Sequence, residues 1–231
     1  MKKTGFLLTS FAALLTAASA SAQDIPVKIG VLTDLSGPYA DASGPGSVFA
    51  AELAVEDFTR QSPGLNVEVI SADHQNKADV ASSIARRWLD DDVNAIVDIA
   101  ASSTAFAVNE LLRDSNALAL FSSAASSGLT GEDCSPHSVQ WTYDTWMLAN
   151  GTGRAVLEAG GDSWFFIAPD YTFGDTLVEQ TSAVVQENGG EVLGSVSHPF
   201  PGQDFSSFIL QAQASGAKVI GLANSGQDMI N

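Results

Sequence analysis

Two clusters of hydroxyl side chains follow two short apolar runs in the middle of the chain. Residues 102–104 follow the run 95–99, and segment 122–127 holds four serines after the run 117–121. A serine that starts a helix places its hydroxyl beside backbone N–H groups without a partner, and this combination suits a carboxylate. For a single cluster, a structural role as a helix cap or turn is favoured over a ligand-binding role. Two clusters at the ends of neighbouring strands make a cradle for a small anionic ligand an equally good interpretation.

These hydroxyls belong to a predicted β-α-β unit, residues 92–130. Between the two apolar runs, Phe106, Leu111 and Leu112 recur at a spacing that lines one face of a helix. In an open parallel sheet, ligands bind at the edge where the strands end. Both clusters are therefore expected at that edge.

The same alternation of strand and helix patterns continues along the chain. Four strands with three intervening helices are expected before Gly131, and three more strands after Thr142. Such alternation predicts an α/β protein with parallel sheets. Either one seven-stranded sheet or two lobes fits this count, and the irregular connection 131–142 favours two lobes. A second lobe with only three strands indicates a fragment.

Other candidate binding residues follow the ends of the remaining predicted strands. They are Tyr39 after the first strand, Tyr171 and Phe173 after the fifth, Asn224 and Ser225 after the seventh, and Trp141 at the connection. Any one aromatic ring in such a place more often packs than binds. Aromatic rings over a ring of hydroxyl and N–H groups are nevertheless the usual lining of a small-molecule cleft.

The first 22 residues have the pattern of a secretory signal peptide. Lys2 and Lys3 form a basic start, residues 6–18 are apolar, and Ala20-Ser21-Ala22 matches a cleavage site. We expect cleavage after Ala22 and a soluble mature chain in a bacterial periplasm.

Charge and motif content narrow the function further. The net charge of −17 at pH 7 disfavours nucleic acid and anionic membrane partners. The chain has no G-x-S-x-G or Walker A sequence, so neither an esterase-type nucleophile nor a phosphate-binding loop is expected.

His74, His137 and His198 lie far apart in presumed loops, which favours surface histidines over a metal site. Cys134, the only cysteine, is expected in a surface loop, free or paired outside the chain. No cofactor is expected.

Several segments together resemble a known family. These are Asp34-Leu35-Ser36-Gly37 after the first strand, the helical pattern 50–58, the segment 170–174 and the segment 204–207. In their order and spacing the chain resembles the periplasmic substrate-binding proteins of branched-chain-amino-acid-type ABC transporters, the Leu/Ile/Val-binding protein family. The resemblance implies a two-lobed type I periplasmic binding protein fold with doubly wound parallel sheets. Residues 1–22 would be the signal peptide, 23–142 the N-terminal ligand-binding lobe and 143–231 a partial, incomplete C-terminal lobe.

The resemblance also implies which residues bind the ligand. Hydroxyl and N–H groups of the first lobe commonly hold a carboxylate, which maps to Ser102 or Ser103 and to the loop that contains Ala124. An aromatic residue of the second lobe, here Phe173 with Tyr171 nearby, commonly covers the ligand. The expected set is Ser102, Ser103, Ser123, Ala124, Ser126, Tyr39, Trp141, Tyr171, Phe173, Asn224 and Ser225.

These observations predict a solute receptor and not an enzyme. It would capture a small carboxylate-bearing ligand between two lobes and deliver it to an ABC permease in the inner membrane. The segment 129–136 looks like a branch of the family associated with aromatic carboxylates. The acidic residue that pairs with a ligand amine would lie beyond Asn231, so amino acids and aromatic acids both remain open. The alternatives are an exported sensor of the same fold that feeds a membrane signalling receptor, and an exported hydrolase, which the missing nucleophile elbow disfavours.

Overall fold

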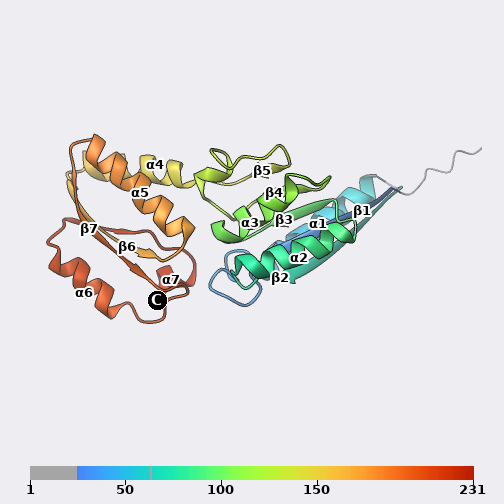
Figure 1. The fold of residues 1–231 in the computed structure, drawn as a ribbon, viewed down its shortest axis with the longest axis horizontal. Helices are drawn as coiled ribbons and strands as arrows, with labels where there is room; N and C mark the ends of the chain where they lie inside the picture. Colours follow the sequence, from blue (N-terminus) through green and yellow to red (C-terminus); the bar gives the residue numbers. More distant parts are fainter. Residues whose placement is uncertain (1–24, 63) are drawn as a thin grey trace, which may run out of the picture.

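A computed structural model describes residues 25–62 and 64–231 of the chain. The expected signal peptide, residues 1–22, lies outside the described residues. The described chain forms two α/β lobes that lie end to end (Figure 1). Within the described ranges, no helix has the length and apolar character needed to cross a membrane.

The first lobe is built on a five-stranded parallel sheet with the order β2-β1-β3-β4-β5. Its strands are β1 (Ile25–Thr33), β2 (Leu65–Asp73), β3 (Ala95–Asp98), β4 (Leu118–Phe121) and β5 (Ser138–Gln140). Its helices are α1 (Gly44–Gln61), α2 (Ala78–Asp90), α3 (Ser102–Leu112) and the short 3-10 helix η1 (Ser127–Leu129). The order places β3, with the first hydroxyl cluster after it, at the centre of the sheet.

The core of the first lobe lies between the sheet and helices α2 and α3. Leu32, Ile96 and Phe121 from the strands are fully buried against apolar side chains of both helices. Trp88 of α2 lies directly over Gly30, where an added Cβ would come within 2.4 Å of the indole ring. The close approach of this helix to the sheet therefore depends on a glycine in β1. Because α3 is part of this core, its first turn is held rigidly at the carboxyl edge of β3.

The second lobe has a three-stranded parallel sheet with the order β7-β6-β8. Its elements are α4 (Thr145–Glu158), β6 (Ser163–Pro169), α5 (Thr172–Glu187), β7 (Glu191–His198), α6 (Ser206–Ala214), β8 (Val219–Leu222) and α7 (Gln227–Ile230). Trp164 and Phe166 of β6 pack against α4 and α5, while Phe165 and Ile167 pack against α6. The alternating side chains of one buried strand therefore hold helices on both faces.

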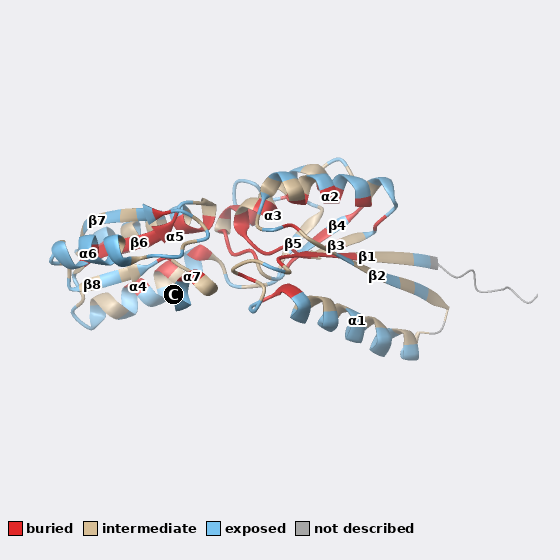
Figure 2. Ribbon diagram, turned by 90° about the horizontal axis from the view of Figure 1, so that it is seen from below, coloured by how far each residue is buried: buried red, intermediate tan, exposed pale blue. Residues whose placement is uncertain are grey.

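Apolar side chains remain uncovered on both lobes. In α1 only Gly44 is buried, and Phe49 of this helix is 66% exposed (Figure 2). Leu118 of β4 and Leu222 of β8 are each 49% exposed. These uncovered faces agree with an incomplete two-lobed fold, as expected from the sequence.

Three sequence predictions about local structure are wrong. The connection 131–142 contains a strand, β5, which pairs with β4; its three residues are too few to show an alternating pattern. The residue pattern predicts a helix over 177–187, whereas helix α5 begins at Thr172, five residues earlier. His74 and His198 are 0% and 1% exposed, so they are not surface histidines. Each lies at a strand end: His74 Nδ1 accepts from the Asn76 N–H at 3.0 Å, and the two ring nitrogens of His198 contact the Pro199 carbonyl oxygen and the Asn224 amide.

Candidate functional site

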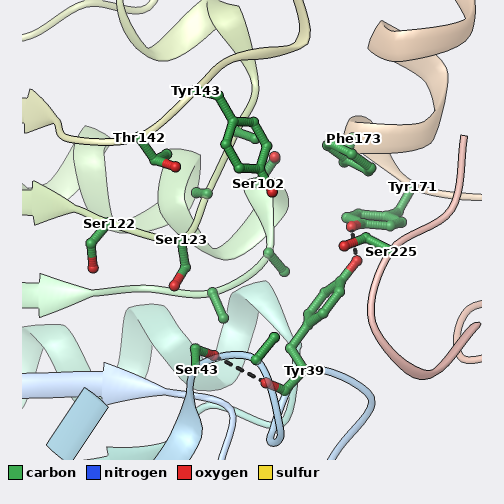
Figure 3. A pocket seen from close by; sticks show the side chains of 15 residues that line it. Tyr39, Ser43, Ser102, Ser122, Ser123, Thr142, Tyr143, Tyr171, Phe173 and Ser225 are labelled. Carbon is green, nitrogen blue, oxygen red and sulfur yellow. Dashed lines mark hydrogen bonds between the residues drawn. The ribbon is translucent and has the colours of Figure 1, made fainter. Parts of the chain in front are cut away.

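A cavity of about 240 Å³ lies between the two lobes, at the carboxyl ends of their strands (Figure 3). Its lining comprises Tyr39, Ala42, Ser43, Ala100, Ala101, Ser102, Ser122, Ser123, Ala124, Ala125, Thr142, Tyr143, Tyr171, Phe173 and Ser225. A cavity of this size has room for a small organic molecule. No lysine or arginine is among the described residues that line it.

The backbone between β3 and α3 is strained. Asp98, Ile99 and Ala101 have positive φ angles of 74°, 57° and 65°. Such angles are rare for residues other than glycine, especially for a β-branched residue such as Ile99, and backbone strain of this kind clusters at functional sites. The strained turn brings the start of α3 to the cavity, which Ser102 lines while being only 1% exposed.

The first turn of α3 has N–H groups without partners. Neither Ser102 nor Ser103 donates its backbone N–H to any acceptor among the described residues, and no side chain caps this helix. The hydroxyl of Thr104 is directed back to the carbonyl oxygens of Ala100 and Ala101. Buried backbone N–H groups are almost always paired in folded proteins, so free ones beside a cavity are suited to an anion.

The loop after β4 has the same property. The carbonyl oxygen of Ala124 accepts from Gln140 Nε2 at 3.1 Å, and that of Ala125 accepts from the Thr145 N–H at 2.8 Å. The N–H groups of Ala124 and Ala125 have no acceptor in the described chain, although both residues are buried and line the cavity. The loop is therefore pinned through its carbonyl groups, which leaves its donors free beside the cavity.

A hydrogen bond joins the two hydroxyl clusters. The Ser126 N–H donates to Ser102 Oγ at 3.2 Å. Because this serine oxygen accepts a bond and its own proton has no acceptor among the described residues, Ser102 is free to donate to a ligand. Ser122 and Ser123 differ, since both of their hydroxyls donate to Asp98 Oδ1, at 3.1 and 2.5 Å.

Aromatic rings from both lobes close the other side of the cavity. The hydroxyl groups of Tyr39 in the first lobe and Tyr171 in the second are hydrogen-bonded to each other (Figure 3). Tyr171 stacks on Phe200 with ring centroids 4.5 Å apart, and Tyr39 lies 5.5 Å from the same ring. Burial raises the pKa of both tyrosines above the ordinary value, so both hydroxyls stay protonated at neutral pH.

Two further hydrogen bonds connect the lobes around the cavity. The Gln227 N–H donates to the Pro38 carbonyl oxygen at 3.0 Å, and Gln180 Nε2 donates to Ser127 Oγ at 2.7 Å. Together with the tyrosine pair, these hydrogen bonds hold the two lobes in contact around the cavity.

The structure brings most of the expected binding residues to this cavity. Those that line it are Ser102, Ser123, Ala124, Tyr39, Tyr171, Phe173 and Ser225. Those that do not are Ser103, Ser126, Trp141 and Asn224. Trp141 is 79% exposed, and the Asn224 amide lies 2.6 Å from His198 Nε2. Ser126 is buried and reaches the site only through its N–H.

The lining also contains residues that the sequence did not indicate. They are Ala42, Ser43, Ala100, Ala101, Thr142 and Tyr143. Tyr143 lies two residues after Trp141 in the segment that crosses between the lobes. The sequence indicated an aromatic residue at this crossing, Trp141, and the residue that lines the cavity there is Tyr143.

Known proteins match almost the whole described chain. The sequence profile of the family described as "Periplasmic binding protein" matches residues 26–231. Leu/Ile/Val-binding protein homolog 6 of Brucella abortus (strain 2308) is 28% identical over 221 residues, which cover 94% of this chain and 55% of the relative.

Two solved structures are similar in sequence and fold. A periplasmic binding protein from Burkholderia mallei is 46% identical with a TM-score of 0.86, over 91% of this chain and 56% of its own. A branched chain amino acid ABC transporter periplasmic ligand-binding protein from Burkholderia xenovorans LB400 is 41% identical with a TM-score of 0.71, over 88% of this chain and 55% of its own. The chain thus spans about half the length of the relatives it matches. It belongs to the periplasmic binding protein family.

Proposed function

We propose that this chain is the ligand-binding part of a periplasmic receptor that captures a small carboxylate-bearing ligand and delivers it to an ABC permease in the inner membrane. The observation that carries the proposal is the set of unpaired N–H groups at the ends of β3 and β4, beside the free hydroxyl of Ser102. Export would remove residues 1–22, with cleavage after Ala22.

The site suits a single negative charge that is held without a cationic side chain. The positive end of the α3 dipole and its free N–H groups stabilise an anion at this position. The Ala124 and Ala125 N–H groups provide further donors across the cavity. A carboxylate accepts several such bonds, and each charge-assisted bond is stronger than a neutral one.

The rest of the ligand would lie against aromatic rings. Tyr39, Tyr171 and Phe173 supply apolar surface, and Tyr143 covers the cavity from the crossing segment. An amino acid with an apolar side chain or an aromatic acid fits this lining. An exported sensor would use the same cleft, so the binding test below applies to both roles.

Binding would work through closure of the two lobes. The carboxylate contacts belong to the first lobe, whereas Tyr171 and Phe173 belong to the second. A ligand that touches both lobes only when they meet stabilises the closed population over the open one.

Thermal unfolding of the full-length gene product, refolded to remove any carried-over ligand, tests the proposal. Amino acids, aromatic acids and short fatty acids would be compared with their carboxamides. A ligand that binds only the folded state raises the unfolding midpoint according to its excess over Kd. We expect a shift with at least one class of acid and none with its amide; no shift with any carboxylate would contradict the proposal.

Adjacent serines offer a matched pair of variants. Ser102→Ala removes a hydroxyl at the cavity and should weaken binding of the active acid by about 10- to 100-fold, the usual value of a hydrogen bond to a charged group. Ser103→Ala removes a hydroxyl from the same helical turn outside the cavity lining and should change the affinity less. Equal losses in the two variants would show that the Ser102 hydroxyl does not hold the carboxylate.

A further inference from the structure

Asp98 is a buried carboxylate beside the cavity whose charge has no cationic partner among the described residues. Asp98 is 3% exposed, and its Oδ2 atom is buried and accepts no hydrogen bond from the described residues. Its Oδ1 atom accepts from Ser122 Oγ and Ser123 Oγ, and its backbone carbonyl accepts from the Ser122 N–H at 3.3 Å. Asp98 thus holds the start of the β4 loop through both side chain and backbone.

These bonds decide what Ser122 and Ser123 can offer a ligand. A hydroxyl has one proton and two lone pairs, so a serine that donates to a carboxylate can only accept further bonds. Both serines line the cavity (Figure 3). Their oxygens therefore present acceptors to it, whereas Ser102 accepts one bond from the Ser126 N–H and keeps its proton free to donate.

The cavity thus has a donor side and an acceptor side. The donors are the N–H groups of α3 and of the β4 loop with the Ser102 hydroxyl, and the acceptors are the oxygens of Ser122 and Ser123. We propose that Asp98 orients Ser122 and Ser123 as hydrogen-bond acceptors, so that the site selects carboxylates that also carry a hydroxyl or N–H donor. The inference rests on the proposed carboxylate-binding function and specifies the class of ligand.

The position of Asp98 fits this role. Its φ of 74° lies in the left-handed region, which aspartate and asparagine tolerate better than other residues with a side chain. Asp98→Asn therefore preserves the backbone and the shape of the side chain. The asparagine amide can itself donate to a serine oxygen, which frees the serine proton and removes the fixed acceptor orientation.

Pairs of acids that differ only in a donor group test the proposal. Suitable probes are 2-, 3- and 4-hydroxybenzoate against benzoate, and leucine against 4-methylpentanoate, titrated into the refolded full-length gene product. A site that hydrogen-bonds a ligand donor rejects the analogue without it, because its own acceptors lose their partner. We expect the wild-type protein to prefer the donor-bearing acid of at least one pair by about tenfold or more.

Ser123→Ala should reduce that preference to less than about threefold, because it removes one of the two acceptor oxygens. Asp98→Asn should reduce the preference as well, although every cavity-lining side chain is intact. Ser36→Ala is the matched control: Ser36 donates to Asp73 at 2.6 Å in a similar serine–aspartate pair outside the cavity lining. This control should leave the preference unchanged.

Two results would overturn the inference while the proposed function survives. One is a wild-type protein that binds acids but shows no preference in any pair; the other is an unchanged preference in both Ser123→Ala and Asp98→Asn. If no acid binds the wild-type protein, the proposed function itself has failed and the inference fails with it. Melting curves of each variant separate a change in selectivity from a loss of folding.

Discussion

Replacing Gly226 with alanine should weaken ligand binding by blocking contact between the lobes. Gly226 lies between β8 and α7 of the second lobe, with φ 60° and ψ −139°. An added Cβ would lie 2.5 Å from the Pro38 carbonyl oxygen and 2.7 Å from Tyr39 Cδ1, and both atoms belong to the first lobe. Real Cβ contacts essentially never fall below 3.0 Å, so the lobes would have to separate by about 0.5 Å at this point.

The size of the effect follows from these contacts. Overpacking of this kind costs about 1–3 kcal/mol. The neighbouring bond from the Gln227 N–H to Pro38, 3.0 Å long, would also stretch, and such a bond contributes about 1 kcal/mol. Because the cost arises only when the lobes meet, it appears in binding. The two effects together cost about 1–4 kcal/mol, so we expect the affinity for the active acid to fall by about 5- to 800-fold.

Gly216 provides the matched control. It also has a positive φ, 71°, but an added Cβ there would meet nothing within 4 Å. Gly216→Ala therefore introduces backbone strain without a contact between the lobes. Calorimetric titration would give the affinity of both variants, and small-angle scattering would report whether the ligand still compacts the protein. If Gly226→Ala binds and compacts as well as Gly216→Ala, this contact does not limit closure and the reasoning is wrong.

Two further predictions concern a buried histidine and an exposed tryptophan. Burial lowers the pKa of His74 below its ordinary value of 6.5. As the pH falls, His74 is therefore protonated in the unfolded chain before it is protonated in the folded chain. The free energy of unfolding should then fall as the pH drops below about 6.5, by at most about 1.4 kcal/mol per pH unit. Urea unfolding between pH 7 and 5 should show a shallower fall for His74→Gln, and parallel curves would contradict this assignment. Trp141→Ala should leave the affinity for the active acid nearly unchanged, whereas Tyr143→Ala should lower it in the same titration; the reverse order would return Trp141 to the binding site.

The α/β alternation and the edge position of the serines could be read from the sequence because both depend on local patterns. Apolar runs 95–99 and 117–121 predict the strands, and in parallel strands the residues after each run must meet at one edge. The prediction of a two-lobed periplasmic binding protein fold with an incomplete second lobe is confirmed.

The donor and acceptor roles within the serine clusters could not be predicted from the sequence. They depend on Asp98, which precedes Ser123 by 25 residues and reaches it only after β3 and β4 pair. The three-residue strand β5 carries no periodic pattern, so nothing in the sequence indicated that Tyr143 and not Trp141 reaches the cavity. His74 is likewise buried beside groups from elsewhere in the chain, Asp34 and Asp98, which the sequence alone does not place next to it.

The most direct test of carboxylate recognition is calorimetric titration of the refolded full-length gene product with an active acid and with its methyl ester. The two molecules share their apolar part and differ in the charge that the α3 and β4-loop N–H groups would hold. The site described here predicts that the ester binds at least about tenfold more weakly than the acid, since the charge-assisted hydrogen bonds are lost. Equal affinity for acid and ester would contradict the central claim that these N–H groups bind a carboxylate.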